Sequence, residues 1–555
     1  MLCAALCGAS AAPAATVQVA GTITGTVTWW NTNEYVLNGF VYVLSNAVLI
    51  IEPGTVIRGK AGTGSDSAAL FITQGAKIFA NGTKHSPIVF TSETDDLDDP
   101  NDIPLWARNL WGGVVILGRA RINTSSDATG NTANPKYDVY EGLPDTQIGG
   151  QYVHRYGGDD DNDNSGVFRY VSIRYSSTTI LPNKEINGLS LCAVGRGTRI
   201  ENVEVFGAGD DAVEFFGGTV NTKYMLSIFC DDDNFDIDQG YSGKNQFWFA
   251  IQAPDRKDNG GEWNGEPSGI AVGASPVANF EIYNATYIGA GTNATGNRAF
   301  LSREYAAPRV FNSIFTEFNV GGNIDTKSAV HFTNWVARFA DNIFWAFASN
   351  GVPQNYWQNA VAQWVLTDPG HLKLLPNPRQ NAVAQWVLTD PANSNLFVDP
   401  QLRSISRTNT PAFRLDPRPQ PGSPALSSPR TAPNDGFYSP VAYRGAFADL
   451  NWASDWTFCG ESGLLSGRNA GTPPPLPSAP PACAQPTLTI VRINDTTAQI
   501  SWPSQVGCTY QLQVSPTLPA ETWSNVGAPQ SGTGGPLSAT ITTTSGNRFL
   551  RVRVQ

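Results

Sequence analysis

The feature that most constrains this chain is a pair of acidic turns that repeat in register 22 residues apart. The acidic positions in these turns are Asp210, Asp211, Glu214, Asp232, Asp233, Asp236 and Asp238. A repeat of this length is typical of one coil of a parallel β-helix, in which each coil buries its apolar side only against its neighbours. The register places carboxylates of adjacent coils about one strand spacing apart, ~4.8 Å.

Like charges at that spacing repel one another unless a bound cation, shared protons or wide solvent exposure relieves the repulsion. Calcium prefers roughly six to eight oxygen ligands, and Asp-rich turns on adjacent coils supply such oxygens. The sequence therefore predicts a Ca²⁺ site formed by the seven acidic residues named above. The alternative is that these residues form turns on a solvated face, since Asp favours turns.

A second acidic run, GGDDDNDNSG, contains a weaker metal-binding pattern. Asp159, Asp161 and Asp163 alternate as at the start of an EF-hand loop. However, Tyr170 stands where that loop carries its bidentate glutamate. A polar surface loop is therefore the favoured interpretation, and a second metal site is the alternative.

The composition indicates an all-β protein. The chain holds 54 Gly and 38 Pro, and only 15% of its residues are charged. Short apolar segments alternate with Gly, Asn and Asp turns from residue 17 to residue 465, which we assign to the β-helix domain. In this domain five side chains are expected to point inward: Leu70, Ile72, Ile78, Ile88 and Phe90. The segment QNAVAQWVLTDP occurs at 358–369 and again at 380–391, through either a duplicated coil or a sequence assembly error.

Three other parts of the chain are distinguished by composition. Residues 1–16 resemble a secretory signal peptide without its basic start. The Pro-rich residues 466–485 predict an extended linker. Residues 486–555 alternate polar and apolar positions as in a small β-sandwich. Within them, Trp502, Tyr510 and Trp523 resemble the pattern of a fibronectin-type-III module.

Charge and cysteine content limit the functional classes. A net charge of −11 argues against nucleic-acid binding, which needs clustered Lys and Arg. No apolar run of about 18 residues follows the leader, so no transmembrane helix is expected. After loss of the leader five cysteines remain, of which Cys459 and Cys483 are a candidate disulfide pair.

Several segments of the long domain carry a family resemblance. They are IEPGTVIRGKAG from Ile51, LWGGVVILGRARIN from Leu110, GDDDNDNSGVFRYVSIRY from Gly158, EINGLSLCAVGRGTRIENVEVF from Glu185, GDDAVEFFGGTVNTKY from Gly209, DDDNFDIDQGYSGKNQFWFAIQ from Asp231, DPRPQPGSPAL from Asp416, and YRGAF with NWASDWTF from Tyr443. Over about 440 residues the chain resembles exported bacterial proteins with a right-handed parallel β-helix. The resemblance implies this fold and a secreted or cell-surface location, and it implies no catalytic residue.

Two functions follow from these observations. The first is an exported structural or glycan-binding protein, adhesin-like and stabilised by calcium, which binds a polysaccharide or cell-surface component and could self-associate into a surface fibre. Exposed aromatic rings can stack on sugars, and Trp248 and Trp263 are the candidates for that role. The alternative is a calcium-dependent polysaccharide-degrading enzyme, a glycoside hydrolase with paired carboxyls or a lyase with Arg169, Arg174 or Lys244 as base.

Overall fold

The chain divides into two compact units, Met1–Pro473 and Pro474–Gln555. The computed structural model describes residues 15–466 and 486–554. The gaps in the first range are 125–135, 257, 267–273, 293, 295–296, 348–389 and 412, and those in the second are 495, 506–507, 517–522, 533–534 and 543–548. Residues 1–14 of the predicted signal peptide, the linker from residue 467 and nearly all of the repeated segment lie outside the described residues. The last two residues of the predicted signal peptide, Ala15 and Thr16, belong to a strand.

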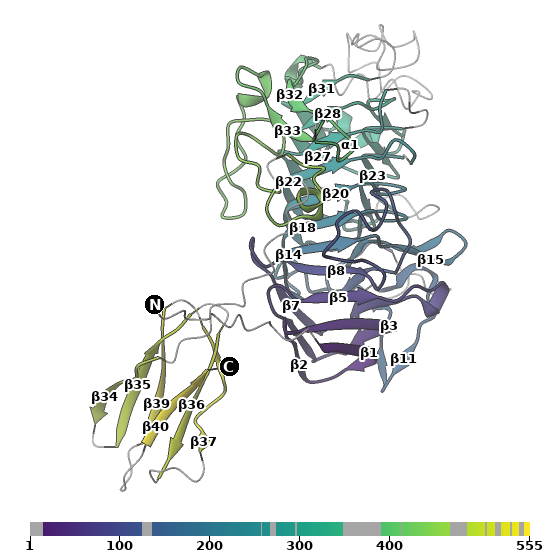
Figure 1. Ribbon diagram of the computed structural model, residues 1–555. Helices are drawn as coiled ribbons and strands as arrows, with labels where there is room; N and C mark the ends of the chain where they lie inside the picture. The colour runs from purple at the N-terminus through teal and green to yellow at the C-terminus, as the bar shows by residue number, and fades with distance from the viewer. Residues whose placement is uncertain are drawn as a thin grey trace, which may run out of the picture. The chain divides into compact units, whose positions relative to one another are not determined.

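The first unit is a parallel β-helix, which confirms the predicted fold class (Figure 1). Its strands form three parallel stacks. The first stack consists of β1 (Ala15–Ile23), β3 (Asn33–Val43), β5 (Val56–Gly59), β8 (Ile88–Ser92), β14 (Gly166–Arg174), β18 (Arg199–Phe206), β20 (Asn221–Ile228), β22 (Lys244–Ile251), β25 (Thr286–Ile288), β28 (Ile314–Thr316) and β31 (Ile343–Trp345).

The second stack shares the long strands of the first. It consists of β2 (Thr26–Trp29), β4 (Val48–Ile51), β7 (Lys77–Asn81), the first halves of β14, β18, β20 and β22, then β24 (Glu281–Tyr283), β27 (Arg309–Phe311) and β30 (Arg338–Ala340). Each long strand bends at a residue with a left-handed backbone, namely Tyr170, Asn202, Tyr224 and Phe247. These bends form one corner of the coil.

The third stack positions the acidic turns. It consists of the end of β3, β6 (Ala69–Ile72), β9 (Val114–Leu117), β17 (Leu189–Cys192), β19 (Val213–Phe216), β21 (Phe235–Asp238), β23 (Gly261–Asn264), β26 (Leu301–Arg303) and β29 (Asn323–Ile324). Beside it lie the short antiparallel pairs β10 (Asp138–Val139) with β13 (Arg155–Tyr156), β11 (Gln147–Ile148) with β12 (Gln151–Tyr152), and β15 (Thr178–Leu181) with β16 (Lys184–Ile186).

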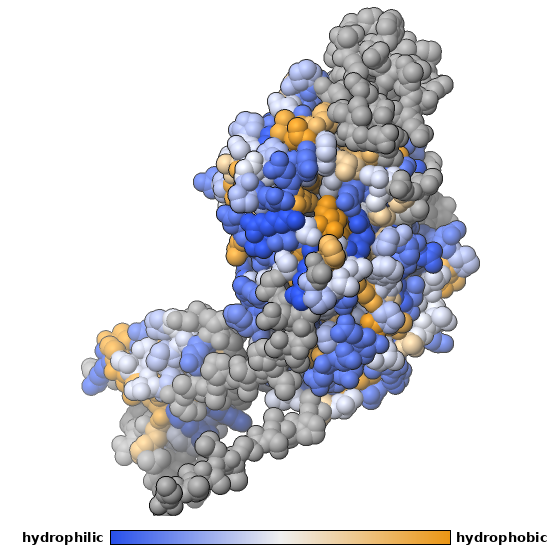
Figure 2. Space-filling view, turned by 45° about the horizontal axis from the view of Figure 1, so that its top comes forward, coloured by the Kyte–Doolittle hydropathy of each residue, from blue (hydrophilic) through white to orange (hydrophobic). Residues whose placement is uncertain are grey.

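The interior of the helix is a continuous apolar core. The five side chains predicted to point inward, Leu70, Ile72, Ile78, Ile88 and Phe90, all belong to it, and that prediction is confirmed. Alternation along each strand places every second side chain inside the coil. On the face of this unit seen in Figure 2, hydrophobic surface occurs as separate patches among hydrophilic residues.

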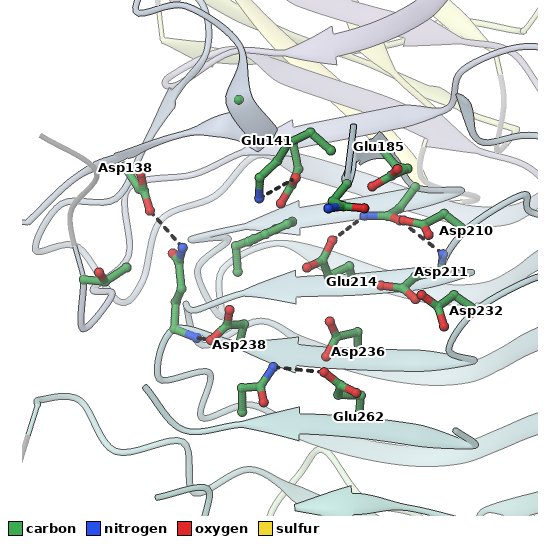
Figure 3. A pocket seen from close by; sticks show the side chains of 18 of the residues that line it. Asp138, Glu141, Glu185, Asp210, Asp211, Glu214, Asp232, Asp236, Asp238 and Glu262 are labelled. Carbon is green, nitrogen blue, oxygen red and sulfur yellow. Dashed lines mark hydrogen bonds and ion pairs between the residues drawn. The ribbon is translucent and has the colours of Figure 1, made fainter. Parts of the chain in front are cut away.

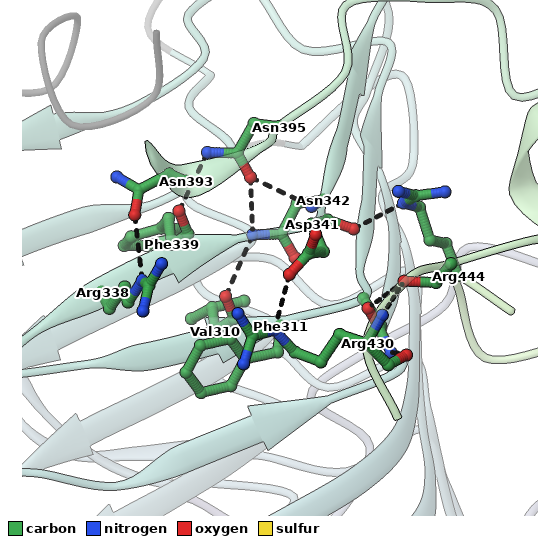
Figure 4. A network of polar contacts seen from close by, with 12 residues as sticks. Val310, Phe311, Arg338, Phe339, Asp341, Asn342, Asn393, Asn395, Arg430 and Arg444 are labelled. Carbon is green, nitrogen blue, oxygen red and sulfur yellow. Dashed lines mark hydrogen bonds and ion pairs between the residues drawn. The ribbon is translucent and has the colours of Figure 1, made fainter. Parts of the chain in front are cut away.

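Residues 390–466 run back along the outside of the helix. At their start they extend the last coil, where the Asn395 side chain accepts a 3.0 Å hydrogen bond from the amide of Asn342 (Figure 4). Further along the chain, Arg430 donates to the Asp341 carboxylate at 2.5 Å, and Arg444 donates to the Asp341 backbone carbonyl at 2.6 Å. This return segment contains β32 (Leu402–Ser404), β33 (Asp416–Pro419) and α4 (Phe458–Glu461).

A buried charge network holds the end of the return segment. The amides of Phe458 and Cys459 donate to the Glu204 carboxylate at 2.6 and 2.8 Å. Arg174 pairs with Glu461 at 2.7 Å, and both side chains are almost completely buried. The return segment is therefore integrated into the β-helix.

The second unit consists of two antiparallel sheets around a small core. One sheet contains β34 (Thr489–Asn494), β35 (Thr497–Pro503) and β39 (Pro536–Thr542), and the other contains β36 (Thr509–Ser515), β37 (Ser524–Asn525), β38 (Gln530–Ser531) and β40 (Phe549–Val554). Trp502, Tyr510 and Leu512 pack between them. This arrangement agrees with the predicted β-sandwich, whereas the likeness to fibronectin type III stays a prediction.

The cysteines differ from the sequence prediction. Cys459 is a buried free thiol enclosed by the return segment, so the predicted Cys459–Cys483 pairing is wrong. Cys508 is disulfide-bonded to a cysteine outside the described residues. The described residues contain no helix that is long and apolar enough to cross a membrane.

The buried pair of Arg174 and Glu461 gives a first prediction. Glu461→Gln removes the direct ion partner of the buried Arg174 guanidinium and leaves only the nearby charges of Asp95 and Glu204, so the free energy of unfolding should fall by about 3 kcal/mol. Denaturant titration measures this change. Glu201→Gln, which removes a more exposed partner of Arg199, is the control and should cost ~1 kcal/mol or less. Equal losses for the two variants would contradict the role assigned to the network.

Candidate functional site

An acidic groove of about 700 Å³ lies along the outer side of the third stack. Ten carboxylates line it and project into it from successive strands and from the flanking loops (Figure 3). They are Asp138, Glu141, Glu185, Asp210, Asp211, Glu214, Asp232, Asp236, Asp238 and Glu262. Only two basic side chains, Lys184 and Arg303, are among the described lining residues. The groove therefore carries a large excess of negative charge.

One outward-facing row of the third stack supplies the floor of the groove. Ser190 pairs with Glu214, Glu214 with Asp236, and Asp236 with Glu262 on successive strands. On the strands that precede β17 in the third stack, the outward side chains of this row are apolar. Tyr140 and Tyr156 cover that part of the sheet. The predicted 22-residue register is confirmed for Glu214 and Asp236, and Glu262 extends the row by one coil.

The turns before these strands are joined by side-chain hydrogen bonds that repeat from coil to coil. The Asn187 side chain accepts from the Asp211 amide at 3.2 Å, and Asp211 accepts from the Asp233 amide at 2.9 Å. Asp233 in turn accepts from the Asn259 amide at 2.6 Å. We call these four residues the turn ladder. Asp211 and Asp233 are both buried, so one oxygen of each has a structural role.

Three groups of acidic oxygens come together closely enough to share a cation. Within each group, one oxygen from each of the three residues lies within 4.8 Å of the others. The groups are Asp210 with Asp211 and Asp232, Asp211 with Glu214 and Asp236, and Asp232 with Asp233 and Asp258. Six of the seven predicted ligands therefore converge. The seventh, Asp238, lines the groove but belongs to none of the groups.

Asp236 gives the sharpest sign that the groove fits a cation. Its Oδ1 atom is buried and makes no hydrogen bond within the described part of the chain. Its neighbour Glu262 is partly neutralised, because it accepts from Asn259 at 3.2 Å and pairs with Arg303. Similarly, Lys184 pairs with Glu141 at 3.1 Å. Both lining bases are thus already engaged, and within the described part of the chain Asp211, Glu214 and Asp236 form no ion pair with a base.

Burial and mutual repulsion raise the pKa values of the groove carboxyls. Burial, together with the charge of Glu185, raises the pKa of Asp210 to about 7. Burial raises the pKa of Asp238 to about 6. The pKa values of Asp211, Glu214 and Asp236 lie well above their usual range, first because of burial and then because of neighbouring carboxylates. Protons or cations therefore stabilise the folded groove.

The second candidate metal site is not formed. Asp161 pairs with Arg121 and lies 3.7 Å from Arg196, and these partners lower its pKa. Asp163 is buried and accepts from Ser165 at 3.2 Å, while Asp159 is exposed. Among the described residues, these three aspartates do not form a converging acidic group. The run is a polar loop, as the favoured interpretation stated.

The prediction that Trp248 and Trp263 bind glycans is wrong. Both side chains are fully buried inside the coil and stack on aromatic neighbours, Trp248 on Phe235 and Trp263 on Phe300. Side chains alternate along β22, so Trp248 points into the coil and Phe249 points outward. Phe447 of the return segment packs on Phe249. Aromatic content alone did not distinguish a core ring from a surface ring.

Several groove residues were not found from the sequence. Asp138, Glu141 and Glu185 come from loops that reach the groove only through folding. Glu262 follows Asp236 by 26 residues, so the fixed 22-residue repeat passes over it. A search for acidic residues at the same strand position on each coil, with variable coil length, would have found Glu262. No sequence signal places the loop residues there.

A family comparison supports this architecture. The family described as pectate-lyase like beta helix domain matches residues 21–350, which include the third stack and the groove. The chain belongs to this family. A search of curated proteins returned no match for this sequence. Membership in the pectate-lyase-like β-helix family agrees with the fold described above, and the chemistry of the groove has to be argued from its residues.

The raised pKa values predict how stability depends on pH without divalent cations. The ordinary pKa of Asp is 3.8, whereas that of Asp210 in the folded protein is about 7. The folded state therefore holds more protons between these values, and stability falls as pH rises through that window. In EDTA, the melting temperature should be lower at pH 8 than at pH 5. A melting temperature that rises over this range would contradict the assignment.

The turn ladder predicts a different response for Ala and Asn at position 233. Asp233→Ala removes the acceptor of the buried Asn259 amide, so the free energy of unfolding should fall by about 1–3 kcal/mol. Asp233→Asn keeps an acceptor oxygen and removes a charge, so at pH 8 in EDTA it should be neutral or stabilising. Denaturant titration compares the two variants, and equal destabilisation would argue against the ladder.

Proposed function

We propose that this protein is an exported β-helix protein that binds Ca²⁺ in the acidic groove and, through the bound cation, holds an acidic polysaccharide. The observation that carries the proposal is the convergence of carboxylate oxygens from three adjacent coils, with an unpaired buried oxygen at Asp236. Without a cation, these charges are offset only in part, by protons, by water and by Arg298 and Arg303 at one end of the cluster.

The donor set favours calcium among the common metals. The described lining residues of the groove offer carboxylate and amide oxygens, and none of them is a histidine or cysteine. Calcium and magnesium prefer oxygen ligands, whereas zinc and copper sites in proteins use imidazole or thiolate. Calcium also tolerates irregular geometry with many ligands, which suits oxygens contributed by several coils.

Charge complementarity supports an acidic glycan as the ligand of the loaded groove. An anionic chain is repelled by ten carboxylates, but a Ca²⁺ ion bound by part of its shell presents positive charge and free coordination positions to an incoming carboxylate. The name of the family refers to pectate, an acidic polysaccharide. The disulfide at Cys508 supports export, since such bonds persist in oxidising compartments.

Calcium-dependent cleavage of the polysaccharide is the second candidate function. Carboxylate oxygens within 4.8 Å of each other resemble the paired carboxyls of retaining glycosidases, which lie about 5–5.5 Å apart. The lyase route has less support, because Arg174 is buried against Glu461 and Lys244 pairs with Asp435, both outside the groove. Assembly into a fibre stays a prediction of the sequence.

Calcium titration and binding to polygalacturonate test the proposal. Ca²⁺ should bind to the wild-type protein in the range of ~0.1–1 mM. At 100-fold excess over Kd it should stabilise the fold by about 2.7 kcal/mol. Asp236→Asn should weaken Ca²⁺ binding about tenfold, because it removes a charged ligand. Asp159→Asn, which changes an exposed acid outside the groove, is the matched control and should leave binding unchanged.

Polygalacturonate should be retained by the wild-type protein in calcium and released by EDTA. Release of new chain ends from polygalacturonate, or from neutral polysaccharides, would establish the enzymatic alternative. A wild-type protein that shows no heat of Ca²⁺ binding and no calcium-dependent shift in melting temperature would overturn the proposal.

A further inference from the structure

The acidic groove continues into a second pocket of different character. This pocket has a volume of about 510 Å³. Asn264 on β23 and Arg303 on β26 are paired and line the groove, and Gly265 and Tyr305, one and two residues further along the chain, line the second pocket. The two cavities therefore adjoin on neighbouring coils, in the direction of the C-terminal end of the helix.

The second pocket presents exposed hydrophobic side chains. Val277 and Val330 line it and are 37% and 42% exposed. Close by, Trp335 and Val336 follow α1 (Ala329–Thr333) and are 51% and 42% exposed. The His331 carbonyl accepts from the Val336 amide at 2.9 Å, which keeps this turn beside the pocket. Single exposed apolar residues are ordinary, but Val277 and Val330 line one cavity together with the Tyr305 ring, which indicates a binding surface.

The backbone holds the aromatic ring of this pocket in a fixed position. Glu304 and Tyr305 both have left-handed backbones, with φ of 52° and 64°. The Glu304 amide donates to Asp325 at 3.0 Å, and its carboxylate pairs with Lys327, whose ammonium lies 5.9 Å from the Tyr305 ring centre. Left-handed residues also form the corners of the coil elsewhere in this unit, so here the backbone serves to fix the position of the Tyr305 ring.

Trp335, like Tyr305, has a left-handed backbone and a cationic side chain close to its ring. Its φ is 60°, and the Arg338 guanidinium lies 5.4 Å from its ring centre. Half of the Trp335 side chain nevertheless faces solvent. The tryptophans predicted to bind glycans lie in the core, whereas Tyr305 lines a cavity that adjoins the charged groove and Trp335 is exposed in the turn after α1.

We propose that this second pocket is a sugar-binding subsite that packs against the apolar face of a pyranose ring of the same polysaccharide chain that the groove holds. The inference rests on the proposed function. Small-molecule sites are typically apolar cavities with a few polar groups that fix orientation. Here Val277, Val330 and Tyr305 supply the apolar contact, and Lys327 and His331 supply polar groups for hydroxyl or carboxylate oxygens. The groove binds charge through calcium, and the pocket adds affinity for longer chains.

Oligosaccharides of different length distinguish binding to the groove alone from binding to the groove and the second pocket. Affinities of oligogalacturonides of two to ten units are measured by calorimetry in saturating calcium, with the full-length protein. In the wild type, affinity should rise with length once the chain reaches from the groove to the pocket. Val330→Ala and Tyr305→Ala, which change two side chains that line the pocket, should each remove about five- to tenfold in affinity for the longer chains and leave the shortest chains unaffected.

Trp106→Ala is the matched control, because Trp106 is 37% exposed and lines neither cavity. Val330 is 42% exposed, so its variant is expected to fold, and an unchanged melting temperature in calcium verifies this for both variants. Identical length profiles in the wild type and both variants, with calcium-dependent binding intact, would overturn the subsite alone. Absence of calcium-dependent binding at every length would overturn the proposed function and the subsite with it.

Discussion

Repulsion between carboxylates on adjacent coils is the constraint on which the functional part of this structure depends. The β-helix fixes the spacing of its coils by backbone pairing, so Glu214, Asp236 and Glu262 cannot move apart without breaking strand hydrogen bonds. The fold relieves the repulsion locally, with raised pKa values and with Arg303 beside Glu262. The relief is incomplete, since an oxygen of Asp236 has no hydrogen bond within the described residues. A site in this condition favours binding of a cation.

The same chain handles buried charge differently where its role is structural. Glu204 is completely buried, but backbone amides of the return segment and the Ser172 hydroxyl donate to it, and the Arg174 charge lies nearby. Every charge there has partners inside the protein, so the network joins two segments and needs no ligand. In the groove, by contrast, the two bases are outnumbered by ten acids. This contrast separates a structural polar network from a candidate binding site.

In the turn ladder, a residue that joins two coils can also belong to a converging acidic group. Asp211 and Asp233 each use one oxygen to bind the amide of the next coil, which is the turn-forming role that the sequence left open. Both residues also belong to converging acidic groups. Turn formation and metal binding were posed as alternatives from the sequence, yet the geometry is compatible with both. The β-helix permits this because its turns stack in register, so that a structural position on one coil faces the same position on the next.

The sequence by itself determined the coil period, the inward-facing residues and the register of the acidic turns, because these depend on local alternation and on a repeat that strand pairing preserves. It did not determine which aromatic rings are exposed: Trp248 is covered by its own coil, and Trp335 lies half exposed after a short helix. Nor did it place Glu141 and Glu185, which reach the groove from loops. Tertiary structure decided these points, since they depend on contacts between segments far apart in the chain, and local pattern carries no information about which segments meet.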